Sequence, residues 1–304
     1  MQARTRTAKV PASELALRQR FAALARGLAG ARAGDVTAIH QTRVATRRLR
    51  EALPLVTSGG AGRKLERIIR RLTRALGPVR ELDVALQTLD ELEQTDVPRA
   101  AVTCLRQLIT SERQTLHAEA VKAIDHSDLE RVRRKVMARV AAADAETPRA
   151  HLVRAQRRAA RRAERLRAAI DNAAGIYLPD RLHEVRIAAK KLRYAIEMVR
   201  PGTAVARTGR AVTRSLRSTS GQLAALKRAQ DLLGRMHDLE VLIARTRAVQ
   251  GTAQAPNLKL SGDLDQLVRR LEMECRLLHG HYMAARPPLV EICDRVERHA
   301  VRAA

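Results

Sequence analysis

Two segments of the chain, 143 residues apart, follow the same pattern. Residues 39–50 read IHQTRVATRRLR and residues 182–193 read LHEVRIAAKKLR. Both have a His-x-x-Arg spacing, then a basic cluster that ends in Leu-Arg. A looser echo follows each segment, LGPVRELDV at 76–84 and LGRMHDLEV at 233–241. Duplication on this scale predicts two helical halves of similar plan, 12–143 and 149–301, related by a pseudo-twofold axis.

The rest of the chain has a helical pattern. Ala, Leu, Arg and Glu, which favour helices, dominate the sequence. Runs rich in Val, Ile, Thr and aromatic residues with period-two alternation are nearly absent, and Pro and Gly mark the breaks. We therefore expect an all-α fold. The expected helices cover about 12–29, 38–56, 62–93, 99–124, 128–143, 149–171, 181–199, 204–248, 262–284 and 287–301.

Each repeated segment gathers cations on one helical face, because about 100° separates successive residues. The two stripes contain His40, Arg43, Arg47 and Arg50 in the first copy and His183, Arg186, Lys190 and Arg193 in the second. Apolar residues such as Leu49 and Leu192 lie on the opposite faces, which we expect to be packed. A single stripe of this kind is typical of a solvated surface, but its recurrence in register favours an anion-binding site.

The residues around each histidine refine this interpretation. Thr37 and Asp180 stand three residues before the histidines, where an N-cap is expected. Each histidine would then lie in the first helical turn, beside unpaired N–H groups that attract phosphate. Glu51 and Glu197 follow Arg47 and Arg193 by four residues, so intrahelical ion pairs are expected to neutralise part of the stripe.

The net charge identifies a class of partner. Lys and Arg number 58 against 32 Asp and Glu, a net charge of +26. Self-repulsion of this size destabilises a compact state, which favours a polyanionic partner such as nucleic acid, an anionic membrane surface or a phosphate polymer. The chain has one Phe, three Tyr and no Trp, so it offers few platforms for stacking single-stranded bases. Duplex DNA bound through its phosphates stays open.

Metal binding and catalysis fit the sequence less well. Arg43, Arg47 and Arg50 would repel a divalent cation, and neither repeat histidine has a partner ligand at i+3 or i+4. The three cysteines have no metal-ligand spacing, and no nucleophile–histidine constellation is recognisable. We expect no metal and no cofactor, and the sequence assigns no catalytic residue. A phosphatase or metal-dependent phosphohydrolase stays open as an alternative.

The expected location is cytoplasmic. The basic N-terminus lacks the apolar run of a signal peptide. No window approaches the ~20 apolar residues of a membrane span, so no membrane association is expected.

At the repeated segments the sequence resembles the CHAD family of α-helical domains. IHQTRVATRRLREAL with LGPVRELDV carries the likeness in the first half, and LHEVRIAAKKLRYAIEM with LGRMHDLEV carries it in the second. The resemblance covers residues 12 to 300, nearly the whole chain. It implies two four-helix bundles with pseudo-twofold symmetry and a central basic groove or channel.

The resemblance also implies non-catalytic binding of inorganic polyphosphate and association with polyphosphate granules. Carried over by position, the two stripes would contact the polymer. Arg70, Arg80 and Lys227 are further candidates. The second LG motif has His237 where the first has Arg80, so the halves are expected to contribute unequally. The alternative function is sequence-nonspecific nucleic-acid binding through the same cations, which the absence of a recognition helix disfavours.

Overall fold

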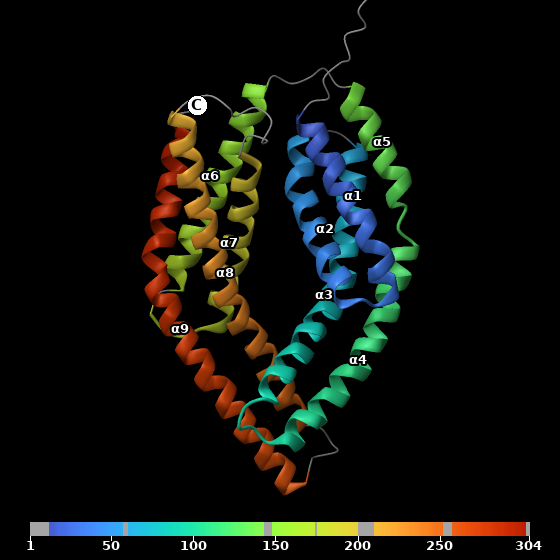
Figure 1. Ribbon diagram of the computed structural model, residues 1–304, viewed down its shortest axis with the longest axis vertical. Coiled ribbons are helices and arrows are strands. Elements are labelled where there is room, and N and C mark those ends of the chain that lie inside the picture. The colour runs from blue at the N-terminus through green and yellow to red at the C-terminus, as the bar shows by residue number, and fades with distance from the viewer. Residues whose placement is uncertain are drawn as a thin grey trace, which may run out of the picture. The chain divides into compact units, whose positions relative to one another are not determined.

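The computed structural model describes residues 12–56, 60–142, 148–173, 175–199, 210–251 and 257–301. Within these ranges every regular element is an α-helix, and the predicted all-α fold is confirmed (Figure 1). The helices are α1 (Ala12–Ala33), α2 (Val36–Val56), α3 (Gly60–Leu92), α4 (Arg99–Asp125), α5 (Leu129–Ala142), α6 (Pro148–Asn172), α7 (Pro179–Val199), α8 (Arg210–Gln250) and α9 (Leu258–Val301). None of the described helices is long and apolar enough to cross a membrane.

One predicted helix break is wrong. Helix α9 continues through Pro287 and Pro288, where the sequence suggests two separate helices. A proline in a helix removes a backbone donor and crowds the preceding turn. Buried residues on both sides of the prolines, Tyr282 before and Cys293 after, nevertheless belong to one apolar cluster. Packing along this continuous face outweighs the local preference of proline, as tertiary burial often does in helices.

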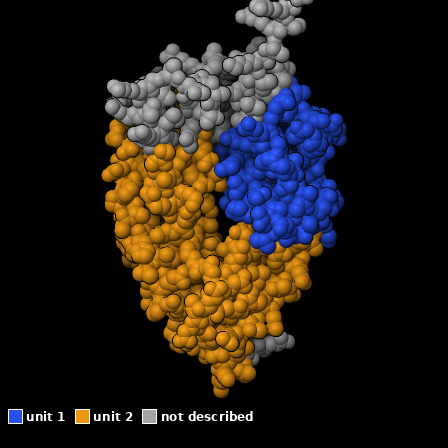
Figure 2. Space-filling view, viewed as in Figure 1, with its two compact units in different colours: residues 1–76, 120–151 blue, residues 77–119, 152–304 orange. Residues whose placement is uncertain are grey.

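The chain forms two compact units (Figure 2). Unit 1 contains Met1–Leu76 and Ala120–His151, and unit 2 contains Gly77–Glu119 and Leu152–Ala304. The long helices α3 and α4 each pass from one unit to the other. Residues 77–119, part of the first sequence half, therefore group with the second half. The predicted halves 12–143 and 149–301 describe the sequence repeat, and their symmetry and central groove stay predictions.

In unit 1, small residues allow α1 to pack closely on α2. A Cβ atom at Gly27 would lie 2.4 Å from Thr42 Oγ1, and one at Gly30 would lie 2.6 Å from Ala38 Cβ. Thr42 itself is fully buried. These two glycines let the helices approach at a distance that any side chain would prevent.

In unit 2, α8 and α9 each contribute to two apolar clusters. The first cluster joins them to α6 and α7, and includes Leu226 to Met236 of α8. The second joins them to the parts of α3 and α4 that belong to this unit, and includes Leu239 to Ile243 of α8. His237 and Asp238 therefore lie at the point of α8 where one cluster gives way to the other. Polar side chains at this point avoid complete burial in either cluster.

Candidate anion-binding site

Both repeat helices begin earlier than the sequence suggests, so the predicted N-caps are wrong. Helix α2 begins at Val36 and α7 at Pro179, which places Thr37 and Asp180 inside the first turn. Asp35 caps α2 by accepting a hydrogen bond of 2.6 Å from the Ala38 N–H. Pro179 suits a first helical position, because its φ is already helical and its missing N–H needs no partner.

Because the helices begin earlier, the two histidines do not lie beside the unpaired backbone N–H groups. The residue before each histidine, Ile39 or Leu182, already donates its N–H to a carbonyl four residues earlier, at 2.9 and 3.1 Å. His40 and His183 thus follow the unpaired N–H groups of the first turn. At these two positions the candidate groups for an anion are therefore side chains, not the unpaired N–H groups.

The first stripe lies on α2 in unit 1. His40 is exposed, whereas Arg43, Arg47 and Arg50 are half-buried. The Arg43 guanidinium donates to the Thr73 carbonyl oxygen of α3 at 3.0 Å, so this arginine helps to attach α2 to α3. On the opposite face the predicted apolar residues are buried, as Leu49 (0% exposed) illustrates.

Arg47 and Arg50 have no ion pair with any described residue. The pair expected between Arg47 and Glu51 does not form, and Glu51 is buried (9% exposed). Its counterpart on α7 does form, with Arg193 Nε 3.7 Å from Glu197 Oε1. The Arg193 guanidinium also lies 5.1 Å from the centre of the Tyr194 ring. The first stripe therefore keeps more of its charge available than the end of the second.

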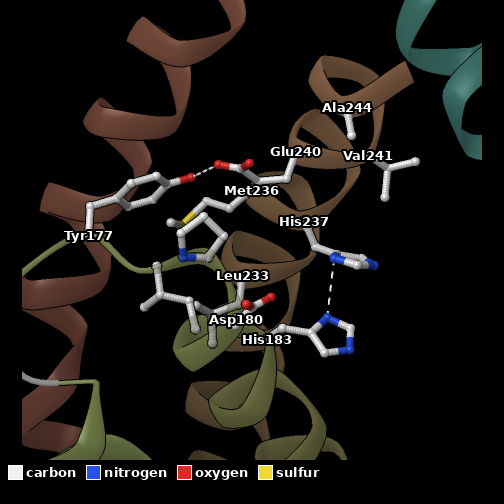
Figure 3. A pocket seen from close by; sticks show the side chains of 11 residues that line it. Tyr177, Asp180, His183, Leu233, Met236, His237, Glu240, Val241 and Ala244 are labelled. Carbon is white, nitrogen blue, oxygen red and sulfur yellow. Dashed lines mark hydrogen bonds between the residues drawn. The ribbon is translucent and has the colours of Figure 1, made fainter. Parts of the chain in front are cut away.

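In unit 2, the histidine of the second stripe is paired with another histidine. His183 Nδ1 on α7 lies 3.1 Å from His237 Nδ1 on α8, and the ring centres are 4.3 Å apart (Figure 3). At this distance one Nδ1 donates a hydrogen bond and the other accepts it. The sequence contains a clue to this pair, since the LG alignment places His237 where Arg80 stands.

Positive charge dominates the surroundings of the pair. Burial, and after it the charges of Arg186, His183 and Lys190, together lower the pKa of His237 to about 4. The pKa of His183 is lowered by burial and by the same two cations. Both rings are therefore neutral at pH 7. Burial raises the pKa of Asp238, the next residue on α8.

Asp238 also shows which cations gather here. The charges of Arg186, Lys190, Arg235 and Arg80 all act to lower its pKa against the effect of burial. Arg80 stands in the first sequence half, but the crossing of α3 into unit 2 places its charge beside the second stripe. The charges of Arg80, Arg186 and Lys190 therefore all act on the Asp238 carboxylate.

The central arginine of this cluster lies close to a glycine of α8. A Cβ atom at Gly234, in the second LG motif, would lie 3.7 Å from Arg186 Nε. The Arg186 side chain therefore extends from α7 across α8 at this glycine.

The two remaining candidates lie on exposed surfaces. Arg70 pairs with Glu66 at 2.9 Å and Lys227 pairs with Asp231 at 2.7 Å, each within its own helix. Neither contact places these cations beside the histidine pair. They extend the basic surface of their helices.

A pocket of about 390 Å³ adjoins the histidine pair, and the sequence did not predict it (Figure 3). Its apolar wall includes Leu182 and Met236. At the far side the Tyr177 hydroxyl donates to the Glu240 carboxylate. Burial, and then this hydrogen bond, raise the pKa of Tyr177. Among the described residues, no group of three or more His, Cys, Asp or Glu side chains could hold a metal ion.

Comparisons with known proteins identify the family. The profile of the CHAD domain matches residues 15–247. The chain belongs to the CHAD domain family. The crystal structure of the CHAD domain from the plant Ricinus communis is similar to this chain, with a TM-score of 0.62, 23% identity, and coverage of 95% of this chain and 94% of that one. PptA from Streptomyces chartreusis aligns with a TM-score of 0.63 and 19% identity over 90% and 97% of the two chains.

At these identities the two structures show a common fold. No match was found among the curated proteins. The CHAD family is associated with polyphosphate, which agrees with the polyanionic partner that the net charge suggests. Residues 15–247 include both repeated segments and both LG motifs, so the family match covers every candidate residue.

Proposed function

We propose that this CHAD protein binds inorganic polyphosphate without catalysing a reaction, and that it associates with polyphosphate granules. The observation that supports this most directly is the cationic cluster on α7. After burial, the charges of Arg186 and Lys190 lower the pKa of both histidines, which indicates a positive local potential. A chain of phosphates is the complement of such a potential.

The first stripe supports the same proposal from a different unit. Arg47 and Arg50 have no ion pair with any described residue, so their charge is available to an anion. A guanidinium that is not neutralised internally can bind successive phosphates through paired N–H groups. A linear polymer needs no shaped pocket, and a row of such cations suffices.

Chain length distinguishes a polymer site from a simple phosphate site. A polyphosphate long enough to reach both stripes would gain affinity from the second contact without any new interaction type. We therefore expect affinity to rise with chain length and to fall steeply as salt increases, because bound counterions are released.

The test is a binding titration with polyphosphates of graded length at two salt concentrations. Arg47→Glu Lys190→Glu should bind long chains at least about tenfold more weakly than the wild type, since charge-assisted hydrogen bonds are worth about 1.5–3 kcal/mol each. Arg157→Glu Arg161→Glu is the matched control, because it changes the net charge equally on the exposed arginines of α6. Equal losses of affinity in both variants would show that binding depends on net charge and not on Arg47 and Lys190.

Competition with duplex DNA tests the alternative. Polyphosphate at equal phosphate concentration should displace DNA from the protein. Displacement of polyphosphate by DNA would favour nucleic-acid binding. Release of orthophosphate by the pure protein with magnesium would contradict the absence of catalysis.

A further inference from the structure

We propose that His183 and His237 act as one proton-binding unit of the anion site, which takes up a proton when polyphosphate binds, so that affinity rises as the pH falls. The inference rests on the proposed polyphosphate binding. It adds His237, on α8, to the phosphate-binding residues.

The geometry limits the pair to one extra proton. The two Nδ1 atoms lie 3.1 Å apart, so the neutral pair holds one Nδ1–H between them. The ring that donates this proton has a bare Nε2 atom, and the other ring carries its proton on Nε2. A proton added to the bare Nε2 leaves the hydrogen bond intact. A second one would have to enter the shared Nδ1 position, where two N–H groups would face each other.

The added proton changes what the pair offers to an anion. The neutral pair presents one Nε2–H donor and one Nε2 acceptor, and the acceptor repels a phosphate oxygen. After protonation both Nε2 atoms donate, and the pair carries a positive charge. Hydrogen bonds from a charged imidazolium to phosphate are shorter and stronger than those from a neutral ring.

Burial and the surrounding charges decide when this proton enters. Arg186 and Lys190 act against protonation of both rings, while Asp180 and Glu184 favour it at His183. The neighbouring helices add Asp238 and Arg235 on α8 and Arg80 on α3 to the charged groups of this cluster. Bound phosphates would offset the two cations and add negative charge beside the rings. The pKa of the pair is therefore higher in the complex than in the free protein.

The sign of the pH effect follows from this difference. A complex that holds one more proton than the free protein is favoured as pH falls through the pKa of the complex. The gain cannot exceed about tenfold in affinity per pH unit for one proton. It ends below the pKa of the free pair, where the free protein is protonated as well.

The experiment measures affinity for long-chain inorganic polyphosphate from pH 8 to pH 5 at fixed ionic strength. Long chains are used because they have few end groups that titrate in this range. The wild type should gain affinity severalfold toward acid pH. Calorimetry in two buffers with different ionisation enthalpies should show uptake of up to one proton.

His183→Gln His237→Gln is the decisive variant, because glutamine can donate and accept hydrogen bonds but cannot be protonated in this range. It should lose most of the gain at acid pH and the proton uptake. His299→Gln is the control. His299 is an exposed histidine of α9, and its Nδ1 atom is hydrogen-bonded to the carbonyl oxygen of Arg295. This control should keep the wild-type profile, and circular dichroism should show that both variants are folded.

The outcomes separate this inference from the proposed function. Wild-type binding with the same affinity at every pH would overturn the proton-binding unit and leave polyphosphate binding standing. An undiminished pH dependence in the double glutamine variant would overturn it as well. Absence of polyphosphate binding at all pH values would overturn the proposed function and the inference together.

Discussion

The two copies of the repeat have the same register and different surroundings. In both helices the histidine is the fifth residue and an arginine follows three residues later. On α2 the histidine is exposed and that arginine, Arg43, donates to a backbone carbonyl of α3. On α7 the histidine is paired with His237, and Arg186 extends across Gly234.

A spacing that is repeated within one chain thus does not give two equal sites. The difference arises from the LG motifs, where Arg80 of the first motif aligns with His237 of the second. His237 completes a histidine pair, while the charge of Arg80 acts on Asp238 in unit 2. Unit 2 thus receives cations from both sequence halves. We expect the positive electrostatic potential at the site in unit 2 to be the higher of the two.

The largest effect is expected from the acidic residues of the two LG motifs, Asp83 and Glu240. The Asp83 carboxylate is fully buried and accepts a hydrogen bond of 2.6 Å from Arg113 Nε. Asp83→Ala should lower the free energy of unfolding by about 3–5 kcal/mol, because it leaves the Arg113 charge without its buried partner. Tyr177→Phe, which removes the hydrogen bond to Glu240, should cost only about 1 kcal/mol.

Urea denaturation of both variants measures this difference. Asp83→Ala Arg113→Leu is the control, because removing both charges should recover much of the lost stability. Similar losses in Asp83→Ala and Tyr177→Phe would show that the two acidic residues have equivalent structural roles. The asymmetry between the LG motifs would then be limited to the position of Arg80 and His237.

The second effect compares the arginines that follow the two histidines. Arg186→Glu Lys190→Glu should weaken polyphosphate binding about a hundredfold at low salt, if each lost contact is worth about 1.5 kcal/mol. It should also raise the pKa of His237 from about 4, because the two cations that depress it are gone. NMR titration of the histidine ring protons measures the shift.

Arg43→Gln provides the contrast on α2. It should lower the free energy of unfolding by about 1 kcal/mol, through loss of the hydrogen bond to Thr73. Its effect on polyphosphate affinity should be smaller than that of the α7 variant. A larger loss of affinity in Arg43→Gln would reverse the ranking of the two copies.

The sequence predicts the parts of this molecule that depend on local pattern. The helical fold, the buried faces of Leu49 and Leu192, and the Arg193–Glu197 pair all follow from helical periodicity, and the structure has them. The family follows from the repeated motifs themselves. Predicting these features does not require knowing which helices pack against one another.

The features that the sequence misses depend on contacts between distant segments. The continuity of α9 through its prolines depends on a shared apolar face, and the true N-caps depend on how the preceding turns run. The pairing of His183 with His237 requires α7 to pack beside α8, and the position of Arg80 requires α3 to pass into unit 2. An alignment of the two LG motifs indicates that these positions differ, but it cannot show what each one contacts.

The smallest effect is expected from the exposed candidates Arg70 and Lys227. Each forms an i,i+4 ion pair on its helix surface, with Glu66 and Asp231. Exposed pairs of this kind contribute about 0.3–0.5 kcal/mol, so Arg70→Gln and Lys227→Gln should leave the free energy of unfolding within about 0.5 kcal/mol of the wild type. Their polyphosphate affinity should fall less than about threefold, because one exposed, partly neutralised cation adds little to a multivalent site. A tenfold loss of affinity in Lys227→Gln alone would show that the binding surface extends along α8, beyond the two repeated helices.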